Sequence, residues 1–157
     1  MKDKILALTE DTVLTLGYVL VETKLNPSKS GMALKAVIHK KGGNVSMDDC
    51  ARLSNVLLRR LEVEIPDFSE KYSLVVESPG ADRKLPTIRE VGIFQDREML
   101  FTLKDPVKFG RKDNAVQGWV DEISGNRLKI SSDGAVLDLE WDDIAGVRLY
   151  FNIKNYL

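Results

Sequence analysis

The organisation of this chain is decided by residues 72–86, YSLVVESPGADRKLP. The first six residues form a short apolar run, which predicts a strand bounded by turn signals. Ser78-Pro79-Gly80 then ends the strand, and Pro86 closes the segment. Two prolines and a glycine predict a defined turn and not a flexible tether. We therefore expect a domain boundary near residues 85–95, with one domain over residues 1–86 and a second over residues 87–157.

The residues before this segment show first a helical and then a strand period. Apolar residues between Asp3 and Leu16 recur at helical spacing, and Gly17 follows where a left-handed residue commonly closes a helix. Residues 18–25 and 32–40 alternate with period two on either side of a turn cluster at 26–31. This pattern predicts an antiparallel hairpin with one buried face.

A second helix is predicted after the hairpin. Ser46, followed three residues later by Asp49, has the spacing of a capping box. The inward face of this helix is formed by Cys50, Leu53, Ser54, Leu57 and Leu61. With the strand at 72–77, the first domain is expected to be an α/β unit of one three-stranded sheet and two helices.

The second domain is predicted to be a small β-barrel. Thr87 and Glu90 predict a short helix that reaches about Phe94. Short strands are then expected at 97–104, 115–122, 127–131, 135–141 and 147–151, separated by glycine-containing turns. Asp133-Gly134 is a strong hairpin signal, and Gly118 is interpreted as a sharp bend of the barrel. The fold class is therefore α+β.

Catalytic and metal-binding groups are scarce. His39 is the only histidine and Cys50 the only cysteine, too few for a typical structural zinc site. The carboxylates of Asp48 and Asp49, like those of Asp142 and Asp143, are adjacent in sequence and diverge in direction. We find no phosphate-binding loop and no nucleophile elbow. The chain is therefore expected to work by binding, without catalysis, cofactor, metal or small-molecule substrate.

Charge and composition indicate where a partner could bind. The net charge is −1, from 23 basic and 24 acidic residues, so the whole chain lacks the basic surplus typical of RNA-binding proteins. Between Thr23 and Met47, however, the charged side chains are all lysines. No apolar run approaches the roughly 18–20 residues that span a bilayer. A lone cysteine and no signal peptide lead us to expect a cytoplasmic protein.

Three groups of residues are the candidate binding sites. The hairpin and its end carry Lys24, Lys35, Lys40 and Lys41; the central turn carries Arg83 and Lys84; the first loop of the barrel carries Lys108, Arg111 and Lys112. Pro79, Gly80 and Asp82 are assigned a structural role between the domains. For Asp82 with Arg83, we expect that role to be fixing the relative orientation of the domains.

Several segments, in order, resemble the ribosome maturation factor RimP family. They are GYVLV at 17–21, DDCARLS at 48–54, YSLVVESPGADRKL at 72–85, GWV at 118–120 and WDDIAGVRL at 141–149. The central segment is the most specific, although Glu77, Ala81 and Lys84 stand where the family usually has serine, leucine and proline. The resemblance implies that the second domain is an SH3-like (Sm-like) barrel. It also implies a monomer that binds the free, immature small (30S) ribosomal subunit late in assembly, near a ribosomal protein at the decoding centre.

Two other functions remain open. A general RNA-binding or RNA-chaperone module would stack bases on exposed aromatic side chains. Trp119, Trp141, Tyr150 and Phe151 are instead expected in the core or at the barrel edge, which argues against it. A protein adapter that contacts a ribosomal protein and little RNA would fit the near-neutral net charge.

Overall fold

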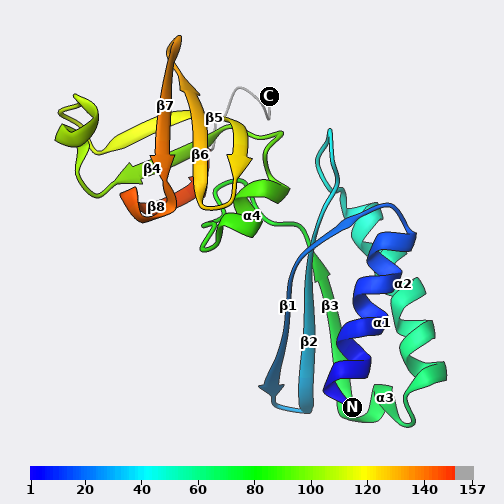
Figure 1. The fold of residues 1–157 in the computed structure, drawn as a ribbon. Coiled ribbons are helices and arrows are strands. Elements are labelled where there is room, and N and C mark those ends of the chain that lie inside the picture. Colours follow the sequence, from blue (N-terminus) through cyan, green and yellow to red (C-terminus); the bar gives the residue numbers. More distant parts are fainter. Residues whose placement is uncertain (151–157) are drawn as a thin grey trace. The chain divides into compact units, whose positions relative to one another are not determined.

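The computed structural model describes residues 1–150 of the chain. The chain divides into two compact units, Met1–Pro79 and Gly80–Leu157 (Figure 1). This division precedes the boundary expected at 85–95 because the residues after Gly80 pair with the last strand of the second unit. The carbonyl of Arg83 accepts a hydrogen bond from Leu149 N–H at 2.9 Å, and Leu85 N–H donates to the carbonyl of Val147 at 2.8 Å.

The N-terminal unit is a three-stranded sheet with its helices packed on one face (Figure 1). Its elements in chain order are α1 (Lys2–Thr15), β1 (Val19–Ser28), β2 (Gly31–His39), α2 (Met47–Glu64), α3 (Phe68–Lys71) and β3 (Tyr72–Glu77). The strand order is β1-β2-β3, with β1 antiparallel and β3 parallel to β2. The predicted three-stranded sheet and its two long helices are confirmed.

The core of this unit lies between α1, α2 and β2. Ile5 of α1, Leu34 of β2 and Leu57 of α2 are fully buried in one cluster. Val13, Ile38 and Leu53 form a second cluster nearer the other end of the same elements. Because each helix presents one apolar stripe to the sheet, burial of these stripes fixes both helices on the same face.

Local signals set the helix ends as the sequence predicts. Ser46 accepts a hydrogen bond from Asp49 N–H at 3.0 Å, and the Asp49 carboxylate accepts one from Ser46 N–H at 2.8 Å, so the capping box before α2 is complete. Gly17 has φ +88°, a left-handed value that follows α1 at little cost for glycine.

The hairpin turn is shorter than predicted. We expected a turn over residues 26–31, but β1 continues to Ser28 and β2 begins at Gly31. Asn26 and Pro27 pair with Ala33 and Met32 in the ladder. Proline is tolerated there because β1 is an edge strand, on which one side of the backbone needs no ladder partner.

The C-terminal unit is built on a five-stranded antiparallel sheet. Its elements are α4 (Ile88–Ile93), β4 (Met99–Leu103), η1 (Pro106–Phe109), β5 (Ala115–Ser124), β6 (Arg127–Ser132), β7 (Ala135–Glu140), η2 (Trp141–Asp143) and β8 (Ile144–Leu149). The strand order is β7-β6-β5-β4-β8. All five predicted strands are present, although the last begins at Ile144 and not at Val147; Phe151 lies outside the described residues. The ladders described for residues 1–150 do not close this sheet, so the predicted barrel is not confirmed.

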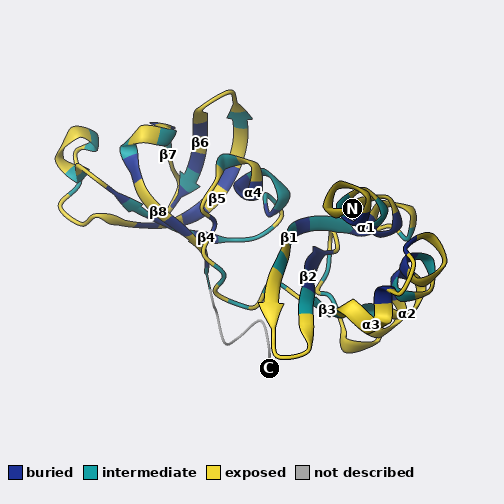
Figure 2. Ribbon diagram, turned by 90° about the horizontal axis from the view of Figure 1, so that it is seen from below, coloured by how far each residue is buried: buried dark blue, intermediate teal, exposed yellow. Residues whose placement is uncertain are grey.

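Alternating burial places one face of this sheet on the core. Met99, Phe101 and Leu149 are fully buried, whereas their strand neighbours Leu100 and Arg148 are partly buried and exposed, respectively. Figure 2 shows buried and more exposed segments alternating along the strands of this unit. Gly118 is needed for a different reason from the bend we predicted. A Cβ at this position would overlap the carbonyl oxygen of Ser131 on β6, so only glycine allows the two strands to approach this closely.

No helix within residues 1–150 is both long and apolar enough to cross a membrane.

Candidate binding surfaces

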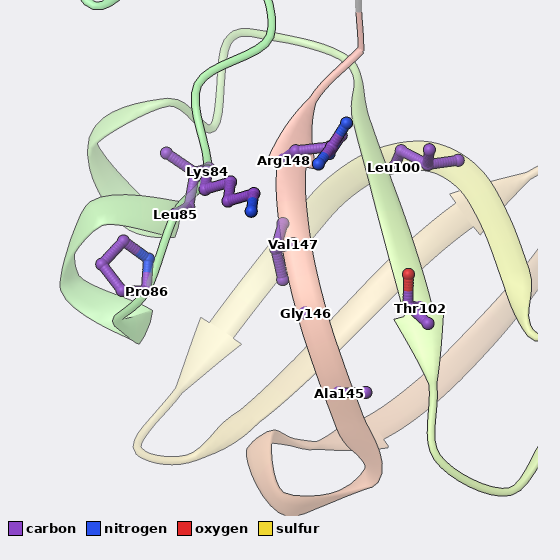
Figure 3. A pocket seen from close by; sticks show the side chains of 9 residues that line it. All are labelled: Lys84, Leu85, Pro86, Leu100, Thr102, Ala145, Gly146, Val147 and Arg148. Atoms are coloured by element: carbon purple, nitrogen blue, oxygen red, sulfur yellow. The ribbon is translucent and has the colours of Figure 1, made fainter.

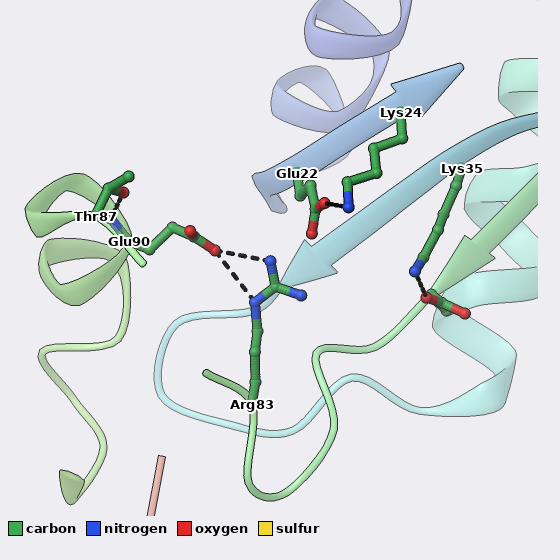
Figure 4. A network of polar contacts seen from close by, with 7 residues as sticks. Glu22, Lys24, Lys35, Arg83, Thr87 and Glu90 are labelled. Atoms are coloured by element: carbon green, nitrogen blue, oxygen red, sulfur yellow. Dashed lines mark hydrogen bonds and ion pairs between the residues drawn. The ribbon is translucent and has the colours of Figure 1, made fainter. Parts of the chain in front are cut away.

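The two candidate lysines on the strands of the hairpin, Lys24 and Lys35, are ion-paired within the N-terminal unit. Lys24 and Lys35 are opposite each other in the β1–β2 ladder. Lys24 contacts Glu22 at 2.9 Å, and Lys35 contacts Glu77 of β3 at 2.9 Å (Figure 4). Glu77 is one of the departures from the family pattern, and here it supplies a carboxylate to a predicted binding lysine. Such exposed pairs contribute about 0–1 kcal/mol, so a partner could displace them at small cost.

The end of the hairpin carries one paired and one unpaired lysine. Lys40 lies 4.0 Å from the carboxylate of Asp49, whereas Lys41 is exposed and forms no ion pair within residues 1–150. The Asp49 carboxylate also accepts a hydrogen bond from the Tyr18 hydroxyl at 2.6 Å. The hydrogen bonds from Ser46 N–H and from Tyr18 lower the pKa of Asp49 from 3.8 to about 2. This carboxylate is therefore charged throughout the neutral range and competes with any anion for Lys40.

Arg83 of the central turn has a structural role inside the C-terminal unit. Its guanidinium donates to Glu90 of α4 from Nε at 3.2 Å and from Nη2 at 2.8 Å (Figure 4). The side chains of Arg83 and Glu90 are only 15% and 8% exposed. Thr87 accepts a hydrogen bond from Glu90 N–H at 3.2 Å, but the Glu90 carboxylate turns to Arg83, so only half of the predicted capping box is seen.

The other residues assigned to the turn make few contacts. Asp82 is exposed and forms no hydrogen bond or ion pair within residues 1–150, and Gly80 has φ +84°. Pro79 is partly buried. Arg83 is thus bonded to Glu90, which the sequence predicts only as part of a helix cap.

The loop after β4 holds the third candidate group. Lys108 is bonded to Asp143 at 2.8 Å and lies 5.6 Å from the centre of the Phe109 ring. The hydrogen bond with Asp143 raises the pKa of Lys108, and the same bond lowers the pKa of Asp143. Lys112 is exposed, and the buried Nε of Arg111 has no hydrogen-bond partner among residues 1–150. The three side chains therefore do not form one uniform cationic patch.

The structure contains a trough that the sequence did not reveal. It has a volume of about 330 Å³ and is lined by Lys84, Leu85, Pro86, Leu100, Thr102, Ala145, Gly146, Val147 and Arg148. Figure 3 shows that it runs along β8, with residues 84–86 on one side and the side chains of Leu100 and Thr102 on the other. A sequence pattern could not have predicted it, because its lining comes from three separate segments of the chain, residues 84–86, residues 100–102 and residues 145–148.

Trp119 is not where we predicted it. It lies on β5, between β6 and β4 in the sheet, and is 46% exposed, so it is neither a core residue nor an edge residue. The strict alternation of β5 places Val116, Gly118 and Val120 inward and leaves Gln117 and Trp119 outward. Trp119 is therefore an exposed aromatic in the middle of a sheet face.

The few reactive side chains lie in structural positions. His39 is 1% exposed at the end of β2, and burial is the main cause that raises the pKa of the Cys50 thiol. Within residues 1–150, no three side chains of the metal-binding types come together.

The comparison with protein families concerns the N-terminal unit. Residues 8–82 match the family model of the RimP N-terminal domain. The match begins within α1, includes the whole sheet of this unit and ends in the turn at Asp82.

Proposed function

Because this chain belongs to the RimP family of ribosome maturation factors, we propose that it binds free, immature small ribosomal subunits and promotes their late assembly. The observation that carries the proposal is the family match over residues 8–82, which spans nearly the whole N-terminal unit. The protein would act in the cytoplasm as a monomer, help ribosomal RNA and proteins reach their mature arrangement, and then dissociate.

The proposed mechanism is reversible binding, with no bond made or broken by the side chains of the protein. Support comes from the positions of the reactive groups, since His39 and Cys50 are placed in the folded interior or against it. We further propose that the five-stranded antiparallel sheet is an SH3-like barrel, as the family resemblance implies. The strand order and the short connections of the C-terminal unit are compatible with this fold.

The ion pairs favour a contribution from protein contacts. Of the nine candidate cations, Lys24, Lys35, Lys40, Arg83 and Lys108 are each paired with a carboxylate. An RNA phosphate would have to replace these carboxylates, whereas a protein surface could use the lysine stems and the neighbouring acids together. We therefore retain the adapter, bound to a ribosomal protein, as the second candidate function.

Gradient sedimentation of a cell extract tests the proposal. One gradient is run at low magnesium, where the subunits separate, and one at high magnesium, where they join. The protein should migrate with free small subunits and be absent from joined ribosomes. Migration only at the top of both gradients, or with the large subunit, would contradict it. Lys40→Glu with Lys41→Glu is the companion variant: unchanged subunit binding across a salt series would exclude the hairpin end as a contact.

A further inference from the structure

Two cationic side chains, a trough and the exposed side chain of Trp119 lie close together on the outer face of the C-terminal sheet. Lys84 is bridged to Arg148 of β8, Arg148 is opposite Leu100 of β4, and Leu100 is opposite Gln117 of β5. Residues directly opposite in antiparallel strands share a face, so these four side chains form one row across the sheet. Trp119 follows Gln117 by two residues and therefore lies on the same face, diagonal to Leu100.

The two cations in this row have no counter-ion. Neither Lys84 nor Arg148 forms an ion pair with any carboxylate in the described part of the chain. Their backbones are joined by the bonds from Leu149 to Arg83 and from Leu85 to Val147, which flank the pair. This is the non-hydrogen-bonded arrangement, in which opposite side chains are closest. Like charges in that arrangement destabilise the sheet, and a bound anion would remove the repulsion.

The trough begins beside this pair and has both apolar and polar lining residues. Residues 84–86 lie on one side and Leu100 and Thr102 on the other, and Gly146 of β8 lies between them (Figure 3). A Cβ built on Gly146 would meet no atom of the described residues within 4 Å, so these residues leave the space above Gly146 open. Thr102 adds a hydroxyl at the wall, where it could bond to a polar edge of the occupant.

We propose that this face, made by the trough, the Lys84–Arg148 pair and Trp119, binds single-stranded RNA. One base would enter the trough, its phosphate would lie on Lys84 and Arg148, and the next base would stack on Trp119. The order of the parts fits this ligand. Along β8, Gly146 and Arg148 are two positions apart, which is about 6.6 Å. Trp119 on β5 lies beyond the cations, and the spacing between β8 and β5 across the sheet is about 9–10 Å. Cations that follow the backbone, with aromatic faces for successive bases, are how proteins hold single strands. The proposal deepens the proposed function, on which it rests for the source of the RNA.

Binding of the full chain to a 5′-fluorescein-labelled 12-nucleotide oligouridylate, measured by fluorescence anisotropy, tests the proposal. Trp119→Ala should weaken binding roughly tenfold or more, the effect expected for loss of one stacked base. Lys84→Glu with Arg148→Glu should also weaken it and should lower the slope of log K against log salt by about 0.7, the value for one phosphate contact on a single strand.

Gly146 offers a steric test with its own control. Gly146→Phe should fill the trough and abolish binding of the oligonucleotide, whereas Gly146→Ala should leave most of it. Lys129→Glu is the charge control, because Lys129 is on the outer side of β6 and does not line the trough. Circular dichroism and urea unfolding of each variant should match the wild type; if Gly146→Phe fails to fold, Trp119→Ala and the double charge variant still decide.

The outcomes separate this inference from the proposed function. Absence of oligonucleotide binding, or binding that all these variants leave unchanged, overturns the inference, even if the protein still migrates with small subunits. Binding of a labelled decaglutamate peptide that the same variants abolish, with no binding of RNA, also overturns it and makes the trough a peptide site. Oligonucleotide binding with the predicted losses supports the inference even if the sedimentation experiment fails.

Discussion

At the scale of single residues, the pair of Arg83 and Glu90 is the feature that stabilises the C-terminal unit most specifically. Both side chains are largely shielded from water, so removing the Glu90 carboxylate breaks a buried, hydrogen-bonded ion pair. We expect Glu90→Ala to lower the free energy of unfolding of this unit by about 3–5 kcal/mol, measured by urea titration. The matched control is Glu122→Ala, which removes the exposed pair with Lys129 and should cost at most about 1 kcal/mol. Equal losses in the two variants would contradict a structural role for Arg83.

Asp49 gives a prediction for the dependence of stability on pH. Its pKa is about 2 in the folded chain, against 3.8 for the ordinary group, so the unfolded state takes up a proton first as the pH falls. Asp49 therefore stabilises the fold fully above about pH 4, and this contribution is lost as the pH falls from 3.8 to 2. We expect Asp49→Asn to be less stable than the wild type at pH 6, and the difference to shrink at pH 2.5. Urea midpoints at both pH values measure this.

The control for this prediction is the neighbouring Asp48→Asn, because Asp48 is exposed in the same first turn of α2. It should change stability little, and by a similar amount at both pH values. A direct measurement is the carboxyl chemical shift of Asp49, which should titrate near pH 2. A titration midpoint close to pH 4 would show that the hydrogen bonds from Ser46 and Tyr18 do not lower the pKa of the Asp49 carboxylate.

At the scale of secondary-structure elements, two glycines in the same sheet should respond oppositely to alanine. Gly118 on β5 has the carbonyl oxygen of Ser131 where a Cβ would be, whereas Gly146 on β8 has open space. Neither has a positive φ, so backbone strain does not distinguish them. We expect Gly118→Ala to separate β5 from β6 and to cost more than about 2 kcal/mol, as overpacking does. Gly146→Ala should be neutral or stabilise by up to about 1 kcal/mol. Similar effects on the urea midpoint would show that the strands can move apart freely.

The elements themselves were largely predictable from local patterns, and their contacts were not. The strand β3 begins and ends where the sequence predicts, and α1 ends before Gly17, because periodicity and end signals act over only a few residues. The predicted turn at 26–31 is too long, because Asn26 and Pro27 are residue types that commonly end a strand. Both are tolerated in β1 because it is an edge strand.

The candidate sites were harder to predict because they depend on pairing between distant segments. The sequence identified the cations but not the carboxylates that neutralise them, such as Glu77 for Lys35 or Asp143 for Lys108. Residue type alone leads us to expect Trp119 in the core or at the barrel edge. Only the register of β5 against β4 and β6 shows that it faces outward.

At the scale of the whole molecule, the two units should unfold as separate cooperative bodies. The buried clusters of the N-terminal unit are built from residues of that unit alone, for example Leu57 with Ile5 and Leu34. We expect Leu57→Ala to reduce hydrogen-exchange protection throughout residues 1–79 and to leave β4–β8 unchanged, while Glu90→Ala should do the reverse. A uniform loss of protection over residues 1–150 in either variant would show that the chain unfolds as one body.

The charge distribution of the whole chain leads to a prediction for the salt dependence of subunit binding. Only Lys41, Lys84, Arg111 and Lys112 among the nine candidate cations form no ion pair within residues 1–150. Each phosphate contact adds about 0.7–0.9 to the slope of log K against log salt, so four free cations give a slope of roughly 3–4, whereas nine would give roughly 6–8. With Arg148, which also forms no ion pair within residues 1–150, we expect a slope no steeper than about 5 for binding of the full chain to purified immature small subunits between 50 and 200 mM salt. A slope near 8 would mean that the paired lysines leave their carboxylates on binding, and a slope near zero would mean that RNA phosphates contribute little and that a ribosomal protein is the main contact.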